Sequence, residues 1–263
     1  MPTLTLNSSL RTDLGRRGNN EDALFATSRL LAVADGVGGA VAGEVASRMV
    51  IDQMASLDKR RLCGPLDDEL REAVLAANQR LGFMISCRPH LAGMASTLTA
   101  LALSNEGEYL VANVGDSRTY LLRDGELQQL TRDGSYVQAL IDHGAISANE
   151  ARRHPQRSVV LEALDGGQNP EPEIVRIDGR AEDRLLLCSD GLSDVVDDER
   201  IAAILRRRSR EEAAERLVAV ALEQGGRDNV SVVVADVTWA EQPSPAWLPA
   251  LPATGSSHLG AAS

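Results

Sequence analysis

The sequence predicts an α+β fold in which antiparallel sheets are covered by paired helices. Two helical patterns occur early in the chain and two occur late, and short apolar strands fall mostly between them. This order differs from the strict strand–helix alternation of a parallel α/β fold. Apolar residues make up 43% of the chain and aromatic residues only 3%, so we expect a substantial core of aliphatic side chains.

The first part of the chain predicts strands followed by two helices. Residues 3–37 have the pattern of a strand, a polar loop and two further strands. Helices are expected over 43–57 and 65–86, the second opened by Pro65, which a first helical turn tolerates. Apolar residues recur along this second helix at spacings of three and four, which predicts core packing: Leu66, Leu70, Val74, Ala77 and Leu81.

The middle of the chain divides into a strand-rich part and a polar part. Residues 96–130 favour strands, with a hairpin turn at Asp124–Gly125. Residues from about 131 to 172 are polar and rich in turns, with one short helix opened by a capping box at Ser147–Glu150. A connection this long with few strand signals is typical of a flap.

The last part predicts strands, two helices and a tail. The elements are strands at 173–177 and 184–189, helices at 198–207 and 210–223, and a final strand at 230–237. Ser209 and Glu212 form a second capping-box pattern, and Gly225–Gly226 ends that helix. Residues 240–263 are rich in Pro, Ala, Ser and Gly, so we expect a disordered tail after a folded domain of residues 1–239.

Charge and cysteine content restrict the partners and the compartment. The formal net charge of −11 argues against nucleic-acid binding, which requires basic surface. Cys63, Cys87 and Cys188 are an odd number without close spacing, which favours a reducing cytoplasm over a disulfide framework. No stretch approaches the ~18 apolar residues of a membrane-spanning helix, and no signal peptide is evident, so we expect no membrane insertion. Nothing in the sequence requires more than a monomer.

Acidic residues stand where five predicted apolar strands begin or end. They are Glu21–Asp22, Asp35, Asp116, Asp190 and Asp228. A carboxylate at the end of a buried strand is held rigidly near water, and several together would form an oxygen pocket for divalent cations. A single Asp-Gly is most often only a turn, but five acidic strand ends are harder to explain as turns alone.

Nine short motifs follow one another in a fixed order between residues 12 and 237. They are Thr12–Gly15, Arg17–Asp22, Val33–Gly39, Gly43–Ser47, Ser96–Leu101, Asn113–Arg118, Leu130–Asp133, Cys188–Asp194 and Gly226–Ser231. Each is weak alone, but the ordered set resembles the type 2C protein Ser/Thr phosphatases, the metal-dependent PPM family, in their compact bacterial form. The resemblance implies a central β-sandwich with a pair of helices on each outer face and a metal site at one end.

The same resemblance implies a centre of two Mn²⁺ or Mg²⁺ ions. In it, Asp35 bridges the ions and Asp190 and Asp228 complete one of them. Glu21 and the Gly36 carbonyl help to hold the other, and water fills the remaining positions. Such a pair makes hydroxide available near neutral pH for attack on phosphorus.

Three more residues receive roles from the resemblance. Arg17 binds the phosphate oxygens, which a planar guanidinium matches two at a time, although it could be a solvated loop residue like Arg16. Asp22 orients water or Arg17. Asp116 either joins Asp190 at a third metal site or is only a hairpin-turn residue, and the sequence leaves both open.

The chain departs from the family pattern at a few positions. Val37 follows Asp35–Gly36 where many eukaryotic members carry a histidine, and Ala40 replaces a histidine common in bacterial members. Asp133–Ser135 and Leu164–Gly166 also differ, and both lie in the expected flap. The two flap changes concern substrate handling more than metal binding, whereas the two missing histidines leave protonation of the leaving group to metal-bound water or another group.

The function implied is hydrolysis of phosphoserine and phosphothreonine on proteins, counteracting a Ser/Thr protein kinase in the cytoplasm. Two alternatives are a catalytically weak phosphatase-like sensor or scaffold, and a small-molecule phosphomonoesterase. The presence of Glu21, Asp35, Asp190 and Asp228 argues against the sensor. A panel of substrates would decide between protein and small-molecule phosphates.

Overall fold

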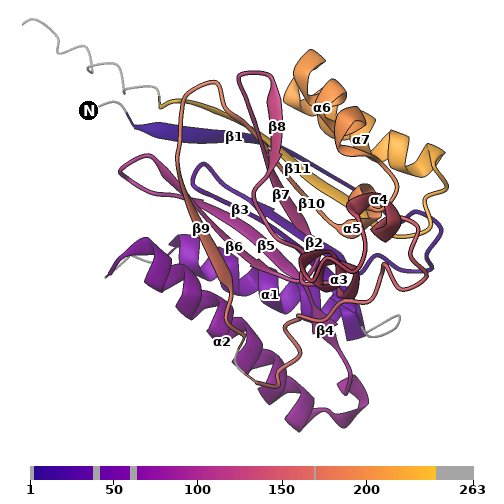
Figure 1. Cartoon of the computed structure of the whole chain (residues 1–263). Helices are drawn as coiled ribbons and strands as arrows, with labels where there is room; N and C mark the ends of the chain where they lie inside the picture. Colours follow the sequence, from indigo (N-terminus) through magenta and orange to yellow (C-terminus); the bar gives the residue numbers. More distant parts are fainter. Residues whose placement is uncertain (1–2, 38–41, 60–63, 169, 241–263) are drawn as a thin grey trace, which may run out of the picture.

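Two antiparallel β-sheets pack face to face, and a pair of helices covers the outer face of each sheet (Figure 1). This computed structural model describes residues 3–37, 42–59, 64–168 and 170–240. The arrangement confirms the predicted α+β fold class, including the αββα sandwich implied by the resemblance.

Each sheet contains strands from distant parts of the chain. The first sheet has the order β1 (Leu4–Asp13), β11 (Val230–Trp239), β10 (Arg184–Cys188), β7 (Arg118–Arg123) and β8 (Glu126–Gln129). The second has the order β2 (Asp22–Ala26), β3 (Leu30–Val37), β5 (Leu98–Leu103), β6 (Glu108–Val114) and β9 (Glu173–Asp178). A two-residue strand, β4 (Ala95–Ser96), pairs with the end of β3.

The continuous apolar run of β3 follows from its position between two layers. Leu31 and Val33 face the opposite sheet, whereas Leu30 and Ala32 face the helices, because successive side chains of a strand point to opposite sides. The helices α1 (Ala42–Lys59) and α2 (Leu66–Cys87) cover this sheet. The helices α6 (Asp198–Arg207) and α7 (Arg210–Glu223) cover the other.

The strongest local signals are confirmed in detail. The helices α6 and α7 have the predicted bounds, and both predicted capping boxes are present, at Ser147–Glu150 and Ser209–Glu212. Asp124 and Gly125 have φ values of 51° and 81°, the left-handed geometry of a two-residue hairpin turn.

Three short elements were not expected from the sequence. They are α3 (Tyr136–Asp142), α5 (Asp190–Ser193) and the 3₁₀ turn η1 (Pro89–Leu91). The prediction that residues 131–172 contain only one short helix is therefore wrong, because α3 precedes α4 (Ala148–Ala151). Elements of one or two turns are too short to display an apolar period, and tertiary contacts fix them instead.

The segment that leaves the flap is fixed to α2 by a buried asparagine. The Asn78 side chain accepts a hydrogen bond from the Gly166 N–H at 2.8 Å and donates to the Gln168 carbonyl at 3.2 Å. A Cβ on Gly82 would lie 2.5 Å from the Gly166 carbonyl oxygen, so only glycine permits this close approach. Ser96 and Leu164 exchange two backbone hydrogen bonds nearby, at 2.9 and 2.8 Å.

Two expectations concern residues outside the described ranges. The tail predicted over 240–263 lies there except for residue 240, and so does Ala40. Across the described residues, no helix combines the length and the apolar character needed to cross a membrane.

Candidate metal centre

The acidic strand ends meet at one end of the sandwich. Antiparallel pairing of β2 with β3 sets Asp22 directly opposite Asp35. On the other sheet, β10 ends two residues before Asp190, and β11 begins two residues after Asp228. Asp116 follows β6 in the same way, after the left-handed Gly115. Neighbouring antiparallel strands thus bring side chains about 200 residues apart in the chain to one edge.

A pocket of about 460 Å³ opens between these strand ends. Seven of the eight predicted site residues line it: Arg17, Glu21, Asp35, Gly36, Asp116, Asp190 and Asp228. Asp22 is not among the lining residues but lies beside Asp35. The prediction that the acidic strand ends converge is therefore confirmed as geometry.

Burial and mutual repulsion strongly perturb the carboxylates of the Asp22–Asp35 pair. Burial raises the pKa of Asp35 well above its ordinary value, and the charges of Asp22 and Asp190 raise it further. Burial also raises the pKa of Asp22 to about 6, despite a hydrogen bond of 2.9 Å from the Ser189 hydroxyl. Like charges directly opposite each other on two strands are unfavourable unless a cation lies between them.

Asp190 and Asp116 show the same behaviour from the other side of the pocket. Burial raises the pKa of Asp190 well above its ordinary value, and the charges of Asp116 and Asp194 add to this effect. Burial, followed by the charge of Asp133, raises the pKa of Asp116 to about 7. The interpretation of Asp116 as a hairpin-turn residue is wrong, because β6 and β7, on either side of it, belong to different sheets. Its side chain is buried and lines the pocket.

Three buried carboxylate oxygens of this cluster have no hydrogen-bond partner among the described residues. They are Glu21 Oε1, Asp22 Oδ1 and Asp190 Oδ1. Buried polar atoms are almost always paired, so unpaired acceptors concentrated in one place indicate that a cation belongs there. Oxygen-only ligands suit hard divalent ions such as Mn²⁺ or Mg²⁺, so the residues present fit the expected metal.

Glu21 and Gly36 lie together at the start of α1. A Cβ on Gly43 would come within 2.8 Å of both the Glu21 carboxylate carbon and the Gly36 carbonyl oxygen. The Gly36 N–H also donates to the Glu21 carbonyl at 3.1 Å. The two oxygen groups that the resemblance assigns to one ion are thus held side by side by a contact that requires glycine at position 43.

Arg17 contacts the cluster directly through Asp228. Its Nη2 atom lies 2.6 Å from Asp228 Oδ2, and its side chain is 54% exposed at the mouth of the pocket. This hydrogen bond raises the pKa of Arg17, so the guanidinium remains charged. Arg17 is therefore partly exposed, as a solvated loop residue would be, but its guanidinium also pairs with a carboxylate of the pocket.

The side chains do not enclose an ion as they stand. In the described part of the chain, no group of three His, Cys, Asp or Glu side chains is arranged to hold one metal. Asp228 lines the same pocket as Asp35 and Asp190, and its Oδ2 atom accepts the hydrogen bond from Arg17.

Two polar residues support the site, and sequence analysis had assigned them no role. Asn229 accepts from the Glu21 N–H at 2.8 Å and donates to the Leu14 and Asn19 carbonyls, both at 2.9 Å. Thr97 accepts from the Asp35 N–H at 3.1 Å. Both residues occur within the motifs, but their roles depend on distant partners that no local pattern reveals.

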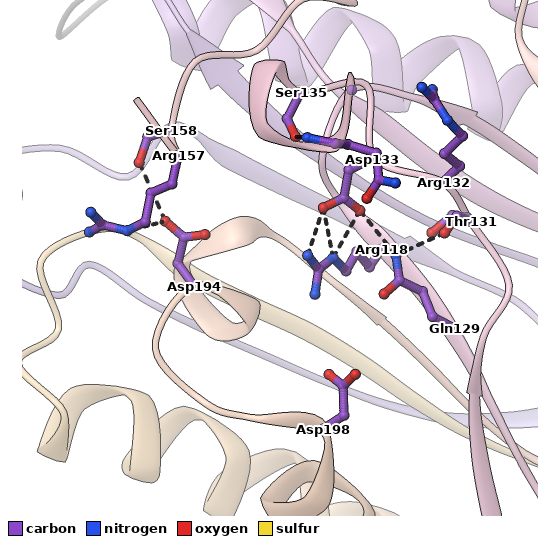
Figure 2. A network of polar contacts seen from close by, with 12 residues as sticks. Arg118, Gln129, Thr131, Arg132, Asp133, Ser135, Arg157, Ser158, Asp194 and Asp198 are labelled. Carbon is purple, nitrogen blue, oxygen red and sulfur yellow. Dashed lines mark hydrogen bonds and ion pairs between the residues drawn. The ribbon is translucent and has the colours of Figure 1, made fainter. Parts of the chain in front are cut away.

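A second, smaller pocket of about 180 Å³ adjoins the first and shares Asp116 and Asp190 with it. Its base is a buried ion pair in which Arg118 binds both carboxylate oxygens of Asp133, with a shortest distance of 2.6 Å (Figure 2). Gln129 also donates to Asp133, at 3.1 Å. Asp133 begins the flap, so this network anchors the flap entry beside the site.

Between the two roots of the flap, the segment around Arg157 reaches the end of α5 through Asp194. Arg157 Nε lies 3.6 Å from Asp194 Oδ2, and the Ser158 hydroxyl donates to the same oxygen at 3.4 Å (Figure 2). These contacts are longer and more exposed than the pair at the flap entry. The flap is therefore firmly held at both of its roots and only weakly held over the pocket.

Comparison with known proteins agrees with this geometry. The family model described as protein phosphatase 2C matches residues 14–224. The Ser/Thr protein phosphatase PstP of Mycobacterium tuberculosis is 50% identical over 236 residues, which cover 89% of this chain but 46% of that protein. The chain thus spans about half the length of this curated relative. The Ser/Thr phosphatase stp of Listeria welshimeri is 35% identical, with 88% of this chain and 96% of that protein covered.

A solved structure shares the whole architecture. It is the catalytic domain of the Ser/Thr protein phosphatase PstP in complex with two manganese ions. The two folds superpose with a TM-score of 0.84 at 46% identity, covering 90% of this chain and 100% of that one.

Proposed function

Because this chain belongs to the protein phosphatase 2C family, we propose that it hydrolyses phosphoserine and phosphothreonine on proteins. The observation that carries the proposal is the pocket in which unpaired, buried carboxylate oxygens face a half-exposed arginine. Such a site combines ligands for cations with a donor for phosphate oxygens. Few functions other than metal-dependent phosphate hydrolysis require cation ligands and a phosphate-binding donor in one pocket.

We assign Asp35, Asp190 and Asp228 to one ion, and Glu21 and the Gly36 carbonyl to a second ion that also contacts Asp35. When bound, this Mn²⁺ or Mg²⁺ pair supplies an activated water and offsets negative charge on the phosphoryl group. Thr97 and Asn229 fix the backbone at Asp35 and Glu21, so these carboxylates remain in place as substrates enter and leave. Asp116, with Asp190, is our candidate for a third ion.

Arg17 is assigned to the phosphate. A guanidinium carries five N–H groups, so the Asp228 contact leaves others for two phosphate oxygens. Asp22 lies beside Asp35 and outside the pocket lining, so its role is to position Asp35 rather than water or Arg17, and the Ser189 hydroxyl holds Asp22 by a hydrogen bond. With the ions bound, the activated water would displace the serine or threonine oxygen from phosphorus and its proton would pass to that oxygen, which gives inorganic phosphate and the free hydroxyl side chain without a phosphorylated enzyme.

The proposal also covers the opposing enzyme, the oligomeric state and the compartment. We infer that the protein reverses a Ser/Thr protein kinase, and that it acts as a monomer in the cytoplasm. Cys87 and Cys188 are free thiols among the described residues, which supports a reducing compartment. The chain's net negative charge supports phosphoprotein rather than nucleic-acid substrates.

Phosphate release from a phosphothreonine peptide tests the function. We expect release that requires Mn²⁺, stops with excess EDTA, and is lost in Asp190→Asn. The matched control is Asp124→Asn, which also removes one carboxylate but lies in an exposed hairpin turn whose left-handed geometry asparagine tolerates. Equal release by Asp190→Asn and Asp124→Asn would contradict the assignment of the metal centre.

A further inference from the structure

Exposed apolar side chains gather beside the phosphate pocket. Among the described residues, six large apolar side chains are clearly exposed: Leu14, Val37, Phe83, Val159, Leu161 and Trp239. Val37 lines the pocket, and Val159 and Leu161 flank Val160, which also lines it. Leu161 is 57% exposed and Val37 is 46% exposed. Apolar surface next to a polar pocket is typical of a binding site.

The backbone at Val160 has an open edge. Val160 is opposite Ser135 in an antiparallel bridge, in which the Tyr136 N–H donates to the Val159 carbonyl and the Leu161 N–H donates to the Gly134 carbonyl, both at 2.8 Å. In this geometry, the N–H and C=O of Val160 itself point away from Ser135. No hydrogen bond involves either group within the described chain, so the edge can accept another strand.

The two faces of this segment differ in what they contact. Val160 lines the phosphate pocket, whereas its neighbours Val159 and Leu161 are not among the lining residues, as expected where side chains alternate along an extended chain. Leu161 lines a separate groove there, together with Glu162. A peptide that pairs with this edge would place alternate side chains on the same two faces.

Resting on the proposed function, we propose that the segment Val159–Leu161 binds the substrate as an added strand and selects its neighbouring residues. The phosphorylated residue enters the pocket on the face of Val160. The residues immediately before and after it then lie against Val159 and Leu161. The substrate class is therefore an extended phosphoserine or phosphothreonine segment with an apolar residue directly adjacent to the phosphorylated one.

A substrate segment fits this surface better than a second copy of the chain. The middle residue of the segment, Val160, lines the pocket that we assign to phosphate, so one ligand can contact both. Three exposed side chains supply far less area than the ~1,000 Å² that a stable dimer needs. A short free edge beside a catalytic pocket suits a peptide.

Matched peptides test the selectivity. Phosphothreonine peptides with leucine or glycine at the position before or after the phosphorylated residue are compared by kcat/KM, with para-nitrophenyl phosphate as a substrate that lacks neighbours. We expect wild type to favour leucine at one of these positions by about tenfold, mainly through KM. Leu161→Ser should remove this preference. Phe83→Ser, which removes an exposed apolar side chain from α2, should retain it.

A binding measurement separates this inference from the proposed function. Fluorescence anisotropy with a non-hydrolysable phosphonate peptide should give a Kd about tenfold lower for leucine than for glycine, and Leu161→Ser should make the two equal. No preference in wild type, or a preference that survives Leu161→Ser, would overturn the inference. Loss of self-association in Leu161→Ser with unchanged peptide selectivity would also overturn it. Absence of hydrolysis with selective binding intact would instead contradict the proposed function.

Discussion

Buried carboxylates at the two ends of β10 have opposite environments. Asp183, just before the strand, is 2% exposed and accepts hydrogen bonds from the Tyr109 hydroxyl at 2.6 Å and from Arg123 at 2.7 Å. Burial alone would raise the pKa of Asp183, but these hydrogen bonds outweigh it and lower the pKa. Asp190, just beyond the strand, has an unpaired oxygen and a raised pKa.

The difference distinguishes a carboxylate that supports the fold from one that is reserved for a ligand. Pairing with arginine and tyrosine satisfies Asp183 within the protein. The pocket carboxylates repel one another, and Arg17 contacts them through Asp228 at the mouth of the pocket. This repulsion lowers the stability of the metal-free protein, and a bound metal ion can restore that stability.

The largest effect should come from removing a charge at the pocket. Asp35→Asn should lower kcat/KM on a phosphothreonine peptide by about a thousandfold, because a residue assigned to both ions supplies several kcal/mol of transition-state stabilisation. Steady-state kinetics at saturating Mn²⁺ measure this loss. Asp124→Asn, assayed in parallel, should match wild type. Near-normal turnover by Asp35→Asn would contradict the proposal that the pocket carboxylates serve catalysis rather than the fold.

At the end of β10 far from the pocket, removing the carboxylate of Asp183 should lower stability and leave activity intact. Asp183→Ala leaves Arg123 and Tyr109 without their partner, so unfolding by urea should become easier by about 3 kcal/mol. Its kcat/KM should remain within about twofold of wild type, because the site is at the opposite end of the strand. A loss of activity without a loss of stability would reverse our interpretation of Asp183.

The pH dependence of this difference follows from the lowered pKa of Asp183. A carboxylate with a lowered folded-state pKa contributes stability above its unfolded pKa of about 3.9 and loses it as the pH falls through the folded value. The stability gap between wild type and Asp183→Asn should therefore be constant from pH 5 to 7 and shrink below about pH 4. A gap independent of pH would exclude the ionised form as its cause.

Metal binding should stabilise the pocket end selectively. Mn²⁺ at about a hundred times its Kd should stabilise the wild type by about 2.7 kcal/mol, seen as a higher melting temperature that EDTA reverses. Asp183→Ala should gain the same increment, whereas Asp190→Asn should gain little. Equal increments in both variants would place the ions away from the pocket.

The smallest effect is also the most diagnostic one. In EDTA, Asp35→Asn should be more stable than wild type, by about 1 kcal/mol, because it removes one of several crowded buried charges. Differential scanning calorimetry of the two chelated proteins measures this gain. Destabilisation by Asp35→Asn in EDTA would show that this carboxylate already has a satisfying partner.

Sequence patterns predicted the elements that carry their own signals. The capping boxes at Ser147 and Ser209 and the turn at Asp124–Gly125 are local chemistry, and all three are confirmed. The helix α3 was missed although local signals are present: Ser135 caps it, and Val137, Leu140 and Ile141 recur at helical spacing. Over only seven residues such a pattern is too short to identify a helix. Its position depends on the flap around it.

The sequence predicted which residues gather at the pocket but not the contacts that their side chains make. Acidic strand ends converge because antiparallel strands end at common edges, which sequence order can suggest. The contact between Arg17 and Asp228 joins residues 211 positions apart, and no local pattern encodes it. The same holds for Asn229, whose three hydrogen bonds reach back to residues 14, 19 and 21.

The pairing of β1 with β11 also determines how the protein can be attached to something else. Leu4 is opposite Trp239, Asp13 is opposite Val230, and the Ala240 N–H donates to the Thr3 carbonyl at 2.7 Å. The start of β1 and the end of β11 therefore lie side by side, about 30 Å along the sheet from the pocket. A fluorescent reporter or a surface tether fused after residue 240 should leave the pocket accessible. The two ends are also close enough for a short linker, so circularly permuted forms could be built with new termini in exposed turns such as Asp124–Gly125.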